Sequence, residues 1–278
     1  MAESNGHPDM TVAGPKGAPV DLDGAFTPGA APLADGRTRT GRRGLVIRPV
    51  LIAVVLVTLY LVVRGLPADS IEARYLNADE LTRELFEHVW LSIISTLCTI
   101  GVAVPLGILI TRPVARWIKP VGLGLGNLGQ AIPSIGLVVL LALWMGTGPT
   151  TVVVALVVYA VLPVLRNTIV GLEGVDRAIV DSARGMGMSK LAVLARIELP
   201  LAVPVILAGI RTALVLTFAS ATLATFIGGG GLGGGLVAGI GLDRPILSVT
   251  YGIIVAALAL LADWLGLVAE EVLRPKGI

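Results

Sequence analysis

Residues 201–227 read LAVPVILAGIRTALVLTFASATLATFI, and Arg211 is the only charged residue in this run. A helix needs about 20 residues to cross the ~30 Å hydrocarbon core of a bilayer, so this stretch is long enough to span a membrane. On either side, further apolar runs occupy residues 50–63, 88–110, 121–145, 149–165 and 246–270. The sequence therefore predicts an all-α integral membrane protein with about six transmembrane helices.

The composition also indicates lipid as the solvent. Of the 278 residues, 55% are hydrophobic and 14% are charged, whereas a soluble domain carries roughly 25% charged residues. The single cysteine, Cys98, excludes a disulfide framework or a multi-thiolate metal site. With only two histidines, His7 and His88, a histidine metal site is not expected either. We expect no metal, no cofactor and no nucleic-acid partner.

Three regions follow from the pattern along the chain. Residues 1–45 are rich in Gly, Pro, Ala, Asp and Arg without hydrophobic periodicity, which predicts a disordered cytoplasmic tail. Residues 46–87 would form an extra N-terminal transmembrane helix and an outer loop. Residues 88–275 would form the main transmembrane domain, with a cytoplasmic loop at 166–200.

The distribution of Lys and Arg predicts the orientation. If the N-terminus is cytoplasmic, the inner segments hold the tail arginines and a larger basic set: Arg112, Arg116, Lys119, Arg166, Arg177, Arg184, Lys190, Arg196, Arg274 and Lys276. The first outer loop is instead acidic: Asp69, Glu72, Asp79, Glu80, Glu84 and Glu87. Because basic residues favour the cytoplasmic side, we predict a multi-pass protein of the cell membrane with both termini inside.

Polar residues interrupt the apolar runs. Asn127, Gln130 and Ser134 would share one face of a helix that Pro133 kinks. Such groups either hydrogen-bond between helices or line a wet path. Thr222 and Thr225 are further candidates for path lining.

Two charged residues lie deep in apolar runs, Arg211 and Asp263. Because an unpaired charge is costly in a membrane, they are predicted to form a buried pair. Glycines 228–231 and 233–235 are expected to form a flexible outer connection.

The loop at 166–200 reads RNTIVGLEGVDRAIVDSARGMGMSKLAVLARIELP. Asp176 can cap a short helix of about 177–184 that Gly185 ends, and Ser189 can cap a second that stops before Pro200. The small residues Ser182, Ala183, Gly185 and Gly187 would let another protein approach the backbone closely. This composition predicts a docking surface. The alternative is a loop that folds back on its own bundle.

The same loop resembles the coupling loop of ABC importer permeases. That family pattern is E-A-A, three residues, G, nine residues, I-x-L-P. Here Asp181, Ser182 and Ala183 are followed by Gly187 and then by Ile197, Leu199 and Pro200 at the full spacing. Asp replaces Glu and Ser replaces the first Ala. The resemblance implies that this loop, with Gly185 inside it, inserts into a cleft of an ATPase subunit.

Further segments resemble the branch that carries glycine betaine, choline and carnitine: VAVPLGILITR (102–112), QAIPSIGL (130–137), LPVLRNTIVGL (162–172), ELPLAVPVILAGIRTA (198–213) and ATLATFIGGGGLG (221–233). The resemblance implies two ATPase subunits, a second permease that is identical or paralogous, and an extracytoplasmic solute-binding protein. ATP would be hydrolysed by the ATPase subunits, so this chain is not expected to be an enzyme.

Two alternatives stay open. Methionine and other amino-acid permeases share parts of these segments, so an amino acid is a second candidate solute. An ion-coupled secondary transporter would need coupling carboxylates near the midplane, where Asp263 is the one evident candidate.

Overall fold

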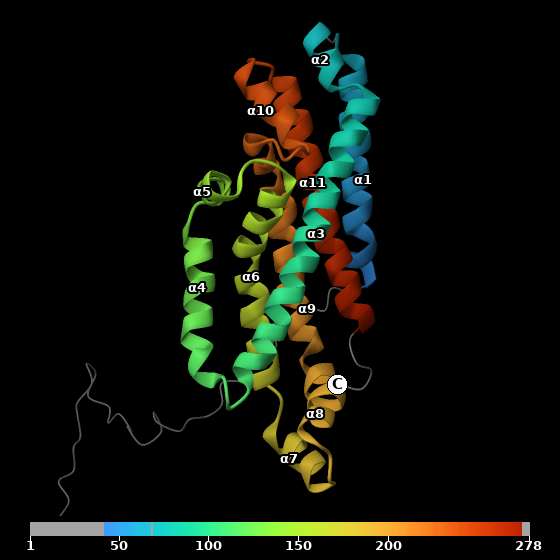
Figure 1. Ribbon diagram of the computed structural model, residues 1–278. Helices are drawn as coiled ribbons and strands as arrows, with labels where there is room; N and C mark the ends of the chain where they lie inside the picture. The colour runs from blue at the N-terminus through green and yellow to red at the C-terminus, as the bar shows by residue number, and fades with distance from the viewer. Residues whose placement is uncertain (1–41, 68, 274–278) are drawn as a thin grey trace, which may run out of the picture. The chain divides into compact units, whose positions relative to one another are not determined.

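The computed structural model describes residues 42–67 and 69–273, and these residues form helices and short connections without a strand (Figure 1). The predicted tail, residues 1–45, lies outside the described residues except for Arg42 to Leu45, which belong to the first helix, α1 (Arg42–Gly65). The short α2 (Ser70–Tyr75) follows, capped by the Asp69 side chain.

Five helices in the described ranges are long and apolar enough to cross a membrane. They are α1, α3 (Ala78–Thr111), α6 (Pro149–Glu173), the continuous run Lys190–Ile227 and α11 (Pro245–Leu273). A sixth span results if α4 (Lys119–Ala131) and α5 (Ser134–Met145) count as one. This arrangement agrees with the predicted all-α bundle.

The bundle is built around α6, which packs against α3, α4, α5 and α9 (Leu199–Ser220). Half of its most apolar stretch is buried inside the chain. Small residues let the backbones approach where these helices cross. A Cβ atom added at Gly209 of α9 would lie 2.7 Å from the carbonyl oxygen of Pro163 in α6. The core therefore depends on close helix contact as well as on bulky apolar side chains.

The helix predicted at 121–145 is broken in two. α4 and α5 meet at an angle of 102°, and Ile132 between them has extended dihedral angles, φ −74° and ψ 130°. A proline disfavours the helical conformation of the residue before it, so Pro133 ends α4 at this point. The prediction that Asn127, Gln130 and Ser134 share one helix face is therefore wrong, since Ser134 belongs to α5.

The boundaries of the predicted loop also differ. α6 continues to Glu173, so Arg166 lies inside a helix and the connection begins about two turns later than predicted. Then come α7 (Arg177–Gly185), α8 (Lys190–Val193) and the π-helical η2 (Leu194–Glu198). The helix does not stop before Pro200 but continues into α9 and the 3-10 helix η3 (Ala221–Ile227). We call residues 174–198 the α7–η2 segment.

The glycine-rich outer connection is more structured than predicted. Gly233, Gly234 and Gly235 begin a further helix, α10 (Gly233–Gly241), which packs against α11. Gly228, Gly230 and Gly231 have positive φ angles of 68°, 81° and 84°, and the Gly231 N–H donates to Glu87 Oε2 at 3.0 Å. These contacts, together with the ring of Tyr251 beside Gly235, fix the segment on the bundle.

Candidate functional site

The α7–η2 segment lies at one end of the bundle, beyond α3, α6 and α9 (Figure 1). Its helices are capped as the sequence predicts. The Asp176 side chain accepts from the Ala178 N–H at 2.9 Å, and the Ser189 hydroxyl accepts from the Ala192 N–H at 3.2 Å. Each cap satisfies a backbone donor that the first turn leaves free.

Gly187 ends α7 through a Schellman motif. The Met188 N–H donates to the Ala183 carbonyl at 3.2 Å and the Gly187 N–H donates to the Arg184 carbonyl at 3.0 Å. This closure needs a left-handed residue at Gly187, whose φ is 88°. Gly185 is the last helical residue, but the positive φ that turns the chain belongs to Gly187.

The predicted docking residues form an exposed surface with a shallow apolar groove. Asp181, Ser182 and Gly185 are exposed, whereas Ala183 is buried. Ile197 in η2 is partly buried, as are Leu199 and Pro200 at the start of α9. A groove of about 350 Å³ is lined by Ala178, Ile179, Ser182, Ala183, Met186 and Ile197. Met186 is 77% exposed and Leu191 74% exposed, and apolar side chains gathered in this way are typical of a protein-binding surface.

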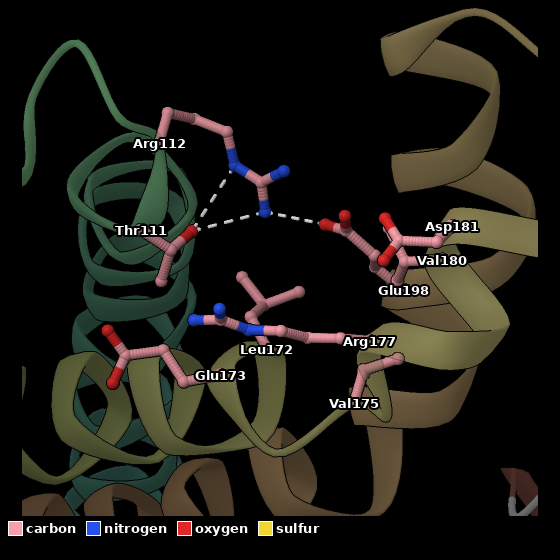
Figure 2. Close-up of a pocket in the computed structure, with 9 residues that line it drawn as sticks. All are labelled: Thr111, Arg112, Leu172, Glu173, Val175, Arg177, Val180, Asp181 and Glu198. Atoms are coloured by element: carbon pink, nitrogen blue, oxygen red, sulfur yellow. Dashed lines mark hydrogen bonds and ion pairs between the residues drawn. The ribbon is translucent and has the colours of Figure 1, made fainter. Parts of the chain in front are cut away.

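A polar hollow of about 460 Å³ separates the α7–η2 segment from the ends of α3 and α6. Figure 2 shows its nine lining residues: Thr111, Arg112, Leu172, Glu173, Val175, Arg177, Val180, Asp181 and Glu198. Across it, Arg112 Nη2 donates to Glu198 Oε2 at 2.6 Å. Arg112 is held in place by contacts with Thr111 Oγ1 and the Ile108 carbonyl. Neither Arg112 nor Glu198 was identified as a site residue from the sequence, although Glu198 is a lone carboxylate between basic residues and Leu199-Pro200.

The path-lining candidates lie on several elements. Asn127 Oδ1 accepts from Arg166 Nη2 at 3.1 Å, and Gln130 Nε2 donates to the Tyr159 carbonyl at 3.3 Å. Both contacts join α4 to α6. The Thr222 hydroxyl donates to the Ala219 carbonyl, three residues earlier in the chain. Ser134 and Thr225 are partly buried, at the start of α5 and in η3. Their role in a path remains a prediction.

The structure brings Arg211 and Asp263 together. Arg211 Nε and Nη2 donate to the two carboxylate oxygens of Asp263 at 2.6 and 3.0 Å. The pair is part of a larger network, because Arg48 of α1 also donates to Asp263 at 3.0 Å and Glu270 lies 4.0 Å from Arg211. Next to it, the Trp264 indole N–H donates to the Leu45 carbonyl at 2.7 Å. Arg48 was not identified from the sequence as a partner of this pair, although its position directly before an apolar run was the available signal.

The opposite end of the bundle is acidic. Glu87 accepts from Arg83 at 3.0 Å as well as from Gly231, and His88 Nε2 donates to the Phe218 carbonyl at 2.9 Å. On the connection to α2, the hydrogen bond from the Glu72 backbone and the nearby Arg244 guanidinium lower the pKa of the Asp69 carboxyl. Among the described residues, no group of three or more His, Cys, Asp or Glu side chains is placed to hold a metal ion.

Comparisons with known proteins agree with this arrangement. Residues 103–273 match the family described as binding-protein-dependent transport system inner membrane component. The chain is 39% identical to the choline transport system permease protein OpuBB of Bacillus subtilis over 204 residues, which are 73% of this chain and 92% of that protein. It is 35% identical to the osmoprotectant import permease protein OsmW of Salmonella typhimurium, covering 76% of this chain and 99% of that protein.

A second Bacillus subtilis protein, the glycine betaine/carnitine/choline transport system permease OpuCB, is 38% identical over 73% of this chain and 92% of its own length. Among solved structures, an inward-facing form of the MetNI methionine ABC transporter superposes with a TM-score of 0.61 at 22% identity, covering 70% of this chain and 96% of that one. This likeness shows the fold, and α1 lies outside the residues matched by the family. The family implies ATPase and binding-protein partners. This chain belongs to the binding-protein-dependent inner membrane components, as a permease subunit of an ABC importer.

Proposed function

We propose that this permease forms the translocation path for a quaternary-ammonium compatible solute such as glycine betaine, choline or carnitine. The observation that carries the proposal is the 38–39% identity, over almost their whole length, to permeases named for choline, glycine betaine and carnitine. The likeness to a methionine transporter, at 22% identity, concerns the fold alone and does not favour an amino acid.

The α7–η2 segment is the ATPase-docking site in this proposal. Exposed Ile179, Met186 and Leu191 supply apolar contacts, and Ser182 and Gly187 keep the backbone accessible. A Cβ atom added at Gly187 would meet no atom of this chain within 4 Å, so the space beside Gly187 is open to a partner. Two ATPase subunits, a second permease that is identical or paralogous, and an extracytoplasmic binding protein complete the assembly.

In the proposed orientation in the cell membrane, the α7–η2 segment and both termini lie in the cytoplasm. Support comes from the charges, because Arg112 ends α3, Lys119 begins α4 and Arg177 begins α7. Asp69 instead caps α2, and Glu80 lies in the first turn of α3. The N-terminal part of α1 lies beside the second half of α11, as the contacts Arg48–Asp263 and Trp264–Leu45 require. The start of α1 and the last part of α11 therefore lie on the same side of the bundle.

ATP binding acts on this chain only through different contacts with two ATPase states. The α7–η2 segment moves with the ATPase, and the helices of the bundle follow between inward-facing and outward-facing forms. Asn127, Gln130, Ser134, Thr222 and Thr225 are the residues that we place along the path. The chain binds no cofactor in this scheme and hydrolyses nothing itself.

The test is purification from the native membrane, identification of the subunits that co-purify, and uptake by proteoliposomes that contain the assembly. Labelled glycine betaine, choline, carnitine and methionine are compared, each with ATP and with a non-hydrolysable analogue. We expect an ATPase subunit to co-purify and at least one quaternary-ammonium solute to accumulate only with ATP. ATP-driven uptake of methionine alone would contradict the proposed solute class, and uptake driven by an ion gradient without ATP would contradict the importer.

A further inference from the structure

The α7–η2 segment is attached to the bundle through both covalent and noncovalent contacts. Two are covalent, through α6 at Gly174 and through α9 at Leu199. Leu194 packs against the apolar cluster of Leu172, Ala202 and Ile206. In addition, Arg112, at the end of α3, forms an ion pair with Glu198, the last residue of η2. Glu198 is only 9% exposed, and the Arg112 guanidinium also contacts Thr111 and the Ile108 carbonyl. The pair therefore joins the exit of the segment to a helix that is remote from it in sequence.

Glu198 also ends an unusual turn. In η2 the Leu199 N–H donates to the Leu194 carbonyl, five residues back, instead of four. The π-helical turn lies directly before Pro200, where a regular helix would lose a hydrogen bond and collide with the carbonyl of residue 196. Single π-helical turns are rare and are frequently found at functional sites.

α3 extends from this ion pair to the opposite end of the bundle. Its 34 residues correspond to roughly 50 Å of helix. Near its start, Glu87 accepts the Gly231 N–H, and His88 contacts the Phe218 carbonyl. The same helix thus contacts the α7–η2 segment at one end and the glycine-rich segment between η3 and α10 at the other.

We propose that Arg112 and Glu198 are positioning residues that transmit movement of the α7–η2 segment to α3, with the π-helical turn Leu194–Glu198 as the bending point. The proposal rests on the proposed function, because the movement originates in the ATPase. When the segment moves, the ion pair makes α3 follow, and α3 shifts its contacts with the glycine-rich segment. Without the pair, the segment moves on the π-helical turn while α3 stays behind.

Glu198→Gln tests this in the complete assembly. It removes the charge, keeps the side-chain size and leaves the exposed docking surface of α7 unchanged. We expect normal membrane level, normal ATPase co-purification and continued ATP hydrolysis, with roughly tenfold less solute transported per ATP, within the ~5–150-fold range of typical coupling free energies. Lys119→Gln is the matched control, because it breaks the ion pair of 2.7 Å between α4 and α6 at the same end without touching the segment. It should leave the transport-to-ATP ratio at the wild-type value.

Exchange of the two charges provides the second measurement. Arg112→Glu combined with Glu198→Arg restores an attractive pair, and we expect it to recover a large part of the ratio that either single reversal loses. A wild-type ratio in Glu198→Gln would overturn the proposal. The proposal would also be overturned if uptake, ATPase retention and ATP hydrolysis all fell in proportion in Glu198→Gln and the charge exchange restored none of them. That result is expected of an ion pair with a merely structural role. Failure of the proposed function is distinct, because wild type itself would then show no ATP-driven uptake.

Discussion

Gly187 is the residue whose backbone decides how α7 ends. Its φ of 88° is costly for residues with a side chain, by about 1–2 kcal/mol in the left-handed region. Gly187→Ala should therefore loosen the end of α7 and reduce ATPase retention, and Gly187→Trp should also block the approach of the ATPase and abolish uptake. Co-purification and uptake measure both effects. Gly185→Ala is the matched comparison, since Gly185 is helical with open space around it, and it should cost much less. Equal losses in the two alanine variants would contradict the role of the positive φ.

Asp263 is the acidic centre of a network that joins three helices. Asp263→Asn leaves Arg211 and Arg48 without their shared partner, and breaking a buried pair in this way costs roughly 3–5 kcal/mol. Both side chains are partly exposed, 26% for Arg211 and 24% for Asp263, so we expect a cost near the lower end of that range. Arg48→Gln should be milder, because it retains the Arg211–Asp263 pair. Thermal stability of the detergent-solubilised protein measures the order of effects, and a larger loss in Arg48→Gln than in Asp263→Asn would refute it.

At the scale of elements, the break between α4 and α5 is set by one proline. Pro133→Ala restores a backbone N–H and lets Ile132 adopt helical angles. Spin labels at Val121 and Leu143, both exposed, should then show a population at longer distance, approaching the ~33 Å of a straight helix. Pro163→Ala is the control, because Pro163 lies inside the unbroken α6 and its replacement should leave the distance distribution unchanged. An unchanged distribution in Pro133→Ala would mean that packing on α6, and not the proline, holds the bend.

Much of the fold was predictable because its signals are local. Hydropathy located the membrane helices, and Asp176 and Ser189 marked the starts of α7 and α8 through cap chemistry. The bend at Ile132 was underestimated as a kink: α4 and α5 meet at 102°, and the contacts of α5 with α6 and η3 cannot be read from the local sequence. The contacts of Arg112 and Arg48 join residues far apart in sequence, and spacing rules carry no information about such pairs. The π-helical turn before Pro200 is local, but it was not predicted. The spacing from Asp181 to Pro200 identified the candidate docking site through its resemblance to the coupling loop of ABC importer permeases. It gave no sign of the hollow beside that site.

For the whole molecule, orientation is the property on which the proposed direction of transport depends. Lys and Arg are more frequent toward the α7 end, and the basic residues of the α2 end are Arg64, Arg74, Arg83 and Arg244, so we expect the α7 end inside the cell. Cysteine placed near Glu80, for example Asp79→Cys, should react with an impermeant thiol reagent in intact cells. Lys190→Cys, exposed in α8, should react only after the membrane is opened. Both belong in a Cys98→Ser background, because Cys98 is free and exposed on the chain. Labelling at 190 but not at 79 in intact cells would invert the assigned orientation, and with it the placement of the ATPase on the α7–η2 segment.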